Sequence, residues 1–172
     1  GHATTYTYDA DLRLIQETDG LGNSTTYTWD EANNRTSVTD KRGNTTSYTY
    51  DERGNLLTVT DPLTQVSTYT YDPDNNLLSE TDANTHTTSF TYDTHSNLTS
   101  RTDALSWVTS YTYYTDTDRK GLLASTTDPL LHTTQYDYDA WGNPNSVTDG
   151  LGNTSSYTYD LGGRQLSGTD PL

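Results

Sequence analysis

The residues of this sequence that could carry acid–base chemistry are four histidines and two regular series of aspartates. His2, His86 and His132 occupy one position of a repeated pattern, where other copies have Asn, Gln or Trp, and His95 stands apart from them. A position that accepts such different side chains behaves as a turn or surface position, not as a tuned base. No repeated position supplies a nucleophile with a base and an orienting group, as acyl transfer requires. The sequence therefore predicts a protein that is not an enzyme.

The aspartates could instead bind metal ions. One series follows Tyr, as Asp51 does, and the other follows Thr, as Asp61 does, so that the two series fall on opposite edges of the predicted sheet. Successive copies in one series are two strands apart, roughly 10 Å. Calcium needs oxygens at about 2.3–2.6 Å, so one ion does not bridge two repeats through these carboxylates. Capping of turns by Asp is the preferred interpretation, structural calcium within one turn is the alternative, and no other cofactor is expected.

Aromatic residues recur in pairs separated by one residue. Aromatic rings suit sugar rings, so these positions could form a carbohydrate-binding surface. Because the same positions recur in every repeat, a packing face is the preferred interpretation. The packing aromatics are Tyr6, Tyr8, Tyr27, Trp29, Tyr48, Tyr50, Tyr69, Tyr71, Phe90, Tyr92, Tyr111, Tyr113, Tyr136, Tyr138, Tyr157 and Tyr159.

Several polar residues could carry covalent sugar. The sequon Asn-x-Ser/Thr occurs at Asn23, Asn34, Asn44, Asn97 and Asn153, whereas Pro144 excludes Asn143. The face of the first strand opposite the aromatics presents further hydroxyls at Thr45, Ser47 and Thr49. A polar coat would explain how a long array with exposed edges avoids edge-to-edge aggregation, and the net charge of -15 could serve that end alone.

The spacing of these residues reveals a repeat. Aromatic pairs recur every 21 residues, with one step of 25 between Tyr111 and Tyr136, and seven units of 21 plus one of 25 account for all 172 residues. The sequence therefore predicts eight repeats over residues 1–172, without separate domains. The longer repeat carries an insertion near residues 114–120 that should bulge from one edge and be the most mobile segment. Thr-Asp marks each repeat at Asp19, Asp40, Asp61, Asp82, Asp103, Asp128, Asp149 and Asp170.

Each repeat reads as two short strands and two turns. In the first repeat, alternation predicts strands over 3–8 and 14–18. In the third, Gly54 should take a positive φ within the turn that starts at Asp51. Pro144 lies inside a predicted strand and should cause a local irregularity, since it removes a ladder donor. The predicted fold is all-β: tandem 21-residue β-hairpins that form a continuous twisted antiparallel sheet, either a spiral or a superhelical array.

Composition narrows the classes of function. The net charge of -15 and a pI near 4.2 argue against nucleic acid and anionic membrane surfaces as partners. There is no apolar run of the roughly 20 residues that a membrane span needs, no signal peptide and no cysteine. Low hydrophobicity with high charge is also typical of disorder, but strict alternation rich in Tyr and Thr favours strands. Because Leu, Ile, Val and Phe are sparse, burial must be shared between repeats.

The repeated motif resembles the Rhs, or YD, repeat. Residues 50–56, Tyr-Asp-Glu-Arg-Gly-Asn-Leu, and residues 138–143 carry the resemblance best, and it extends over all eight repeats. Members include bacterial Rhs polymorphic toxins, the C components of Tc toxins, wall-associated proteins and animal teneurins. The resemblance implies spiralling β-sheets, often a hollow cocoon around a toxin domain. The sequence lacks a toxin domain, a plug domain and the self-cleaving core-end motif, so the resemblance carries over the architecture only.

The two ends of the sequence match each other in register. Residues 169–172 followed by residues 1–6 reproduce an internal junction, such as residues 148–157. We therefore expect a window of a longer array or the repeating unit of a filament. The predicted function is a non-catalytic structural segment of an extracellular or cell-surface polypeptide that forms a fibril or filament. The alternatives are the wall of a toxin cocoon and a carbohydrate-binding adhesin. Expected partners are further copies or continuation of the array and covalent glycans, but neither nucleic acid nor an inserted membrane.

Overall fold

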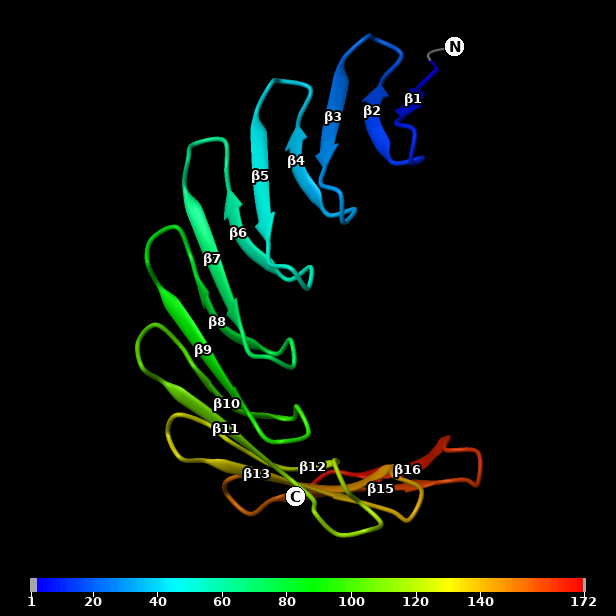
Figure 1. The fold of residues 1–172 in the computed structure, drawn as a ribbon. Helices are drawn as coiled ribbons and strands as arrows, with labels where there is room; N and C mark the ends of the chain where they lie inside the picture. Colours follow the sequence, from blue (N-terminus) through cyan, green and yellow to red (C-terminus); the bar gives the residue numbers. More distant parts are fainter. Residues whose placement is uncertain (1–2, 172) are drawn as a thin grey trace. The chain divides into compact units, whose positions relative to one another are not determined.

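The computed structural model describes residues 3–171, which form sixteen β-strands and no helix. The strands lie in the sheet in the order in which they occur in the chain, and the observed pairs are antiparallel (Figure 1). The all-β prediction of tandem hairpins is therefore confirmed. The strands are β1 (Thr5–Tyr8), β2 (Leu14–Thr18), β3 (Ser24–Trp29), β4 (Arg35–Thr39), β5 (Thr45–Tyr50), β6 (Leu56–Thr60), β7 (Val66–Tyr71), β8 (Leu77–Thr81), β9 (Thr87–Tyr92), β10 (Leu98–Thr102), β11 (Val108–Tyr113), β12 (Leu123–Thr127), β13 (Thr133–Tyr138), β14 (Pro144–Thr148), β15 (Thr154–Tyr159) and β16 (Gln165–Thr169).

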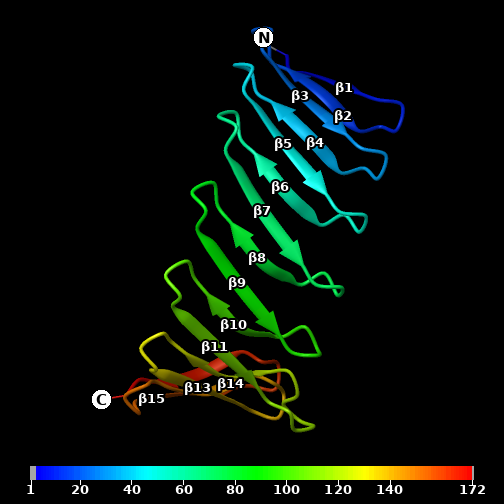
Figure 2. The ribbon, with the colours of Figure 1, turned by 60° about the vertical axis from the view of Figure 1, so that its left-hand side comes forward.

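The chain divides into two compact units, residues 1–87 and 88–172. In the first unit, strands β1 to β8 follow one another side by side, each paired with the next (Figure 2). In the second unit, β9 to β16 repeat this arrangement. Within each unit, antiparallel order places the Tyr-Asp turns at one edge of the sheet and the Thr-Asp turns at the other.

The turns of the two edges share one backbone geometry. The third hairpin illustrates it: the N–H of Asp51 donates to the carbonyl of Asn55 at 2.9 Å, and the N–H of Gly54 donates to the carbonyl of Asp51 at 3.1 Å. The residue at the fourth position takes a positive φ, which is 85° at Gly54 and 67° at Asn75. Glycine and asparagine reach this region at least strain, so the positive φ predicted for Gly54 is confirmed.

Each of the eight hairpins of the described chain contains a β-bulge that alternation alone does not reveal. In the third hairpin Tyr50 pairs with Leu56 but Thr49 pairs with Thr58, so Leu57 is the extra residue. The bulge shifts the second strand by one residue. It places Leu56 opposite Tyr50 on the aromatic face and leaves hydroxyl side chains opposite one another on the other face.

The local irregularity predicted at Pro144 is present, but the proline is not its cause. Tyr138 pairs with Pro144 and Asp137 pairs with Ser146, which is the same shifted register as in the other hairpins. Pro144 is the first residue of β14 and lies next to the bulge, where the loss of one backbone donor is tolerated.

None of the described residues is fully buried, so the sheet has no ordinary core. Its two faces nevertheless differ. Tyr48 and Tyr50 are half-buried, whereas Thr45 and Thr49 on the opposite face are exposed, as predicted. The aromatic face is therefore the packing face of β5, and neighbouring hairpins supply what burial there is. For Tyr6 and Tyr8 in the terminal strand β1 the packing prediction is wrong, because they are 55% and 54% exposed and no hairpin of the described chain precedes them.

The insertion (residues 114–120) leaves the strands undisturbed but does more than bulge from an edge. Strands β11 and β12 keep the register of the other hairpins. The insertion leans on the following hairpin instead, because the hydroxyl of Tyr114 donates to the carbonyl of Tyr136 at 2.8 Å. The mobility of the insertion stays a prediction.

Candidate functional site

The aspartate at the first position of each turn holds the loop with its side chain. In the third hairpin, Asp51 Oδ1 accepts the backbone N–H groups of Arg53 and Asn55, both at 2.9 Å. Its Oδ2 accepts the side-chain amide of Asn55 at 3.0 Å. These donors stabilise the charged form, so the pKa of Asp51 is lowered, with the Asn55 amide as the largest cause. The turn-capping interpretation of the aspartates is confirmed.

The Thr-Asp turns on the other edge are held in the same way. Asp40 Oδ1 accepts the backbone N–H groups of Arg42 and Asn44 at 2.8 and 2.9 Å, and Oδ2 accepts the Asn44 amide at 2.9 Å. The Asn44 amide is the largest cause of the lowered pKa of Asp40. An acceptor occupied by three donors is a poor general base.

The same contacts disfavour metal binding. Over residues 3–171, no three His, Asp or Glu side chains gather where a metal ion could be held. The turn carboxylates face N–H donors, whereas calcium requires a shell of oxygens. Structural calcium stays a prediction.

The histidines lie where turn residues belong. His86 Nδ1 is 3.0 Å from Asp82 Oδ2, and His132 Nδ1 is 2.9 Å from Asp128 Oδ2, so both replace the asparagine of other turns. His95 occupies the third position of its turn and is exposed. His2 lies outside the described residues. The three described histidines, His86, His95 and His132, thus lie at three different turns.

The sequon asparagines are part of the turn contacts. An N-linked glycan is attached to the side-chain nitrogen Nδ2 of asparagine. In each of the five sequons this Nδ2 donates a hydrogen bond to the turn aspartate. Asn23, Asn44 and Asn153 are exposed at the Thr-Asp edge, and Asn34 and Asn97 are half-buried at the Tyr-Asp edge. The five contacts join Asn23 to Asp19, Asn34 to Asp30, Asn44 to Asp40, Asn97 to Asp93 and Asn153 to Asp149. Glycosylation stays a prediction, and it would compete with these contacts.

The face opposite the aromatics is a surface of paired hydroxyls. Thr49 Oγ1 lies 2.7 Å from Thr58 Oγ1 across the hairpin, and Thr45 Oγ1 lies 2.8 Å from Thr39 Oγ1 across the connection. Ser47 lies between them on the same face and is half-buried. Cross-strand hydroxyl pairs of this kind stabilise a sheet. The hydroxyls of Thr45 and Thr49, which were predicted to carry sugar, thus also stabilise the sheet through cross-strand hydrogen bonds.

In several hairpins the second aromatic residue donates a hydrogen bond to the hairpin before. The hydroxyl of Tyr50 donates to the carbonyl of Arg35 at 3.0 Å, and the indole of Trp29 donates to the carbonyl of Leu14 at 2.9 Å. Tyr113 makes the same contact fifteen residues back, at 2.9 Å. These side chains therefore combine packing with a directed hydrogen bond, which sequence periodicity did not reveal.

One cluster of charged residues was missed at the level of sequence. Arg119 of the insertion places Nη1 2.6 Å from Asp137 Oδ1 and Nη2 3.0 Å from Asp116 Oδ2. Its guanidinium lies 3.9 Å from the ring centre of Tyr114. Asp137 replaces the threonine found at this position in other hairpins, such as Thr49, and that replacement is the signal that could have revealed the contact.

A comparison with protein families identifies the repeat. The model of the RHS Repeat matches residues 8–45, 36–66, 50–87, 71–105 and 118–154, which is well over half of the chain. A search of curated proteins returns no match.

Solved structures of toxin complexes share the fold. The crystal structure of TcdB2-TccC3 without its hypervariable C-terminal region aligns with a TM-score of 0.71 and 20% identity, over 98% of this chain and 10% of that chain. The Tc holotoxin pore of Photorhabdus luminescens aligns with a TM-score of 0.68 and 20% identity, over 91% of this chain and 10% of that chain. This chain thus spans about a tenth of the length of those chains, and the likeness concerns the fold.

Proposed function

Because the chain belongs to the RHS repeat family, we propose that it is a wall segment of a longer shell-forming polypeptide, with a structural and not a catalytic role. The observation that carries this proposal is the use of the repeated residues. The aspartates hold turns, as Asp51 does, the second aromatics join hairpins, as Tyr50 does, and the hydroxyls pair across strands, as Thr49 does. The residues that recur in the repeats therefore serve to form the sheet.

The fold likeness supports a shell over a fibril. The similar solved structures are parts of Tc toxin complexes, and the resemblance to the family implies a hollow cocoon. The two unlike faces also suit a wall, since one face is aromatic and half-buried and the other carries hydroxyls. A secreted or cell-surface location follows from the same relatives as part of the proposal.

Protease protection tests the shell. The longer native polypeptide that contains this segment is treated with protease before and after mild denaturation, and its fragments are identified by mass spectrometry. A shell predicts that any enclosed segment resists cleavage until the wall unfolds. Equal cleavage of all segments under native conditions would contradict a closed wall.

A glycosylated fibril is the second candidate, and the exposed sequons favour it. Asn23, Asn44 and Asn153 lie at one edge of the sheet, where a glycan would project into solvent. The intact mass of the native polypeptide tests this candidate, because each N-linked glycan adds mass at a mapped asparagine. A mass that equals the unmodified chain would remove the support for a glycan coat.

A further inference from the structure

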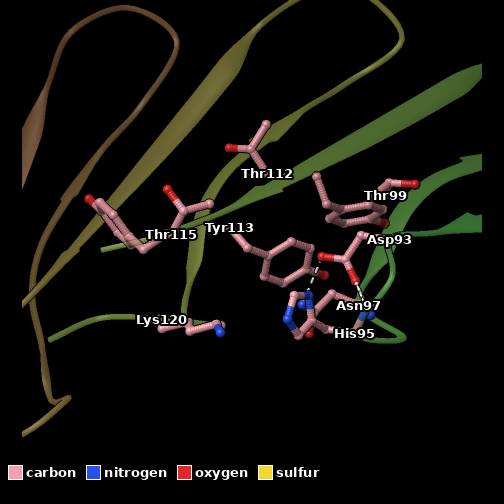
Figure 3. Close-up of a pocket in the computed structure, with 11 residues that line it drawn as sticks. Asp93, His95, Asn97, Thr99, Thr112, Tyr113, Thr115 and Lys120 are labelled. Atoms are coloured by element: carbon pink, nitrogen blue, oxygen red, sulfur yellow. Dashed lines mark hydrogen bonds between the residues drawn. The ribbon is translucent and has the colours of Figure 1, made fainter. Parts of the chain in front are cut away.

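A cavity of 720 Å³ lies at the Tyr-Asp edge of the second unit, between the β9–β10 turn and the insertion (Figure 3). Small-molecule sites span about 300–1,000 Å³, so its size suits a ligand of one or two rings. Its lining includes His95 and Asn97 from the turn, Tyr111 and Tyr113 from β11, and Thr115 and Lys120 from the insertion.

At the same edge of the first unit, an arginine of one turn reaches directly to the next turn in two places. Arg13 Nη1 donates to the carbonyl of Asp30 at 2.8 Å. Arg53 Nη1 donates to the carbonyl of Asp72 at 3.0 Å. These contacts fill the space between successive turns with protein atoms.

The insertion breaks this pattern because it leans toward the following hairpin. Tyr114 bonds to the carbonyl of Tyr136, and Arg119 pairs with Asp137, so both anchors of the insertion lie on β13. Thr115 and Lys120 of the insertion line the space between the insertion and the turn that holds His95. The cavity occupies that space.

The nitrogen donors that face this cavity are largely unused. Within the described chain Lys120 makes no ion pair, whereas the other lysine, Lys41, lies 2.8 Å from Asp19 Oδ2. The only polar contact of the His95 ring in the described chain is a 3.4 Å approach to Thr94 Oγ1. Figure 3 shows Lys120 and His95 on the same side of the cavity, beside the Tyr113 ring.

The acidic and aromatic side chains that line the cavity are held by hydrogen bonds within the protein. Asp93 accepts the N–H groups of His95 and Asn97 and the Asn97 amide, at 2.8 to 3.0 Å, so its oxygens are occupied. The Tyr113 hydroxyl donates to the carbonyl of Leu98, which holds the ring in place. The cavity thus combines a preorganised aromatic wall with two free cationic or hydrogen-bonding nitrogens.

We propose that this cavity binds a saccharide that carries a carboxylate, such as a hexuronic acid. The ring of Tyr113 offers a flat apolar surface to the sugar, Lys120 and His95 face the carboxylate, and Asn97 and Thr115 face the hydroxyls. The chain as a whole is acidic, but distant charges are screened over about 8 Å at physiological ionic strength. The one carboxylate in the lining, Asp93, directs its oxygens at the donors of its own turn, so the ammonium group of Lys120 is the charge available to the ligand. The site is separate from the proposed wall function.

NMR titration of the folded chain with D-glucuronate tests the site, with D-glucose as the uncharged analogue. We expect glucuronate to shift the amide signals of residues 93–99 and 111–121. Lys120→Gln should weaken glucuronate binding by about fivefold, the upper end for an ion pair open to water, and leave glucose binding unchanged. His95→Ala should also weaken glucuronate binding.

Two matched variants control for unspecific effects. Lys41→Gln removes the other lysine, and His86→Ala removes an exposed histidine of a different turn, so neither should change glucuronate binding. The proposal is overturned if glucuronate shifts no signals around the cavity. It is equally overturned if glucose binds as tightly as glucuronate, or if Lys41→Gln weakens binding as much as Lys120→Gln does.

Discussion

The substitution Gly54→Val tests whether the turns, more than a core, set the stability of a hairpin. Gly54 has a φ of 85°, and a Cβ added there would meet only Asn34 Oδ1, at 3.6 Å. Because that distance is an ordinary contact, the destabilisation comes from the backbone. An L-residue in the left-handed region costs about 1–2 kcal/mol, and a β-branched side chain belongs at the upper end.

Urea unfolding measures this effect. With an m-value of about 3 kcal/mol/M, a loss of 1–2 kcal/mol lowers the midpoint by roughly 0.5 M. Hydrogen exchange should place the loss in β5 and β6, since repeat arrays respond locally. Gly54→Asn is the matched control, because Asn33 and Asn75 hold the equivalent position at a φ of 67°. Equal midpoints for the Val and Asn variants would refute the reasoning.

Three further outcomes follow from the contacts. The pKa is lowered in the folded state for the turn aspartates Asp40, Asp51, Asp72, Asp139 and Asp149. Their stabilisation is therefore present above the unfolded pKa of about 3.9 and is lost as pH falls below it. Urea midpoints measured from pH 7 to pH 2 should drop below about pH 4, and a flat profile would contradict the turn contacts. Tyr50→Phe removes the bond to the Arg35 carbonyl and should lower the free energy of unfolding by about 0.5–1.5 kcal/mol, more than Tyr48→Phe does; equal effects would mean that the bond contributes nothing. Limited proteolysis should cut the insertion first, and Asp137→Thr, which removes the partner of Arg119, should speed that cleavage; an unchanged rate would show that the ion pair does not hold the insertion.

The hairpins could be predicted from sequence because the residues that form each strand and each turn lie close together in the chain. Alternation at Thr45 to Tyr50 marks a strand, and Asp51 with Gly54 and Asn55 marks a turn that the structure shows in full. Repetition of the signal in eight copies removes the ambiguity of any single copy.

The remaining features depend on register and on contacts between hairpins. Nothing in the alternation of Leu56 and Leu57 shows which residue is the bulge, because that depends on pairing with Tyr50. The residues of the insertion do not show its direction, and the one signal in the sequence is Asp137, which replaces a threonine in the next repeat. The cavity beside the insertion depends on the direction in which the insertion leans, so the repeat pattern alone could not predict it.

Electron cryo-microscopy of the native polypeptide that contains residues 1–172 tests the proposed wall segment most directly. A shell predicts closed hollow particles in which these hairpins form part of a continuous curved sheet around an interior. Open fibres would contradict the shell and favour the glycosylated fibril. Separate monomers with no enclosed interior would contradict both assemblies.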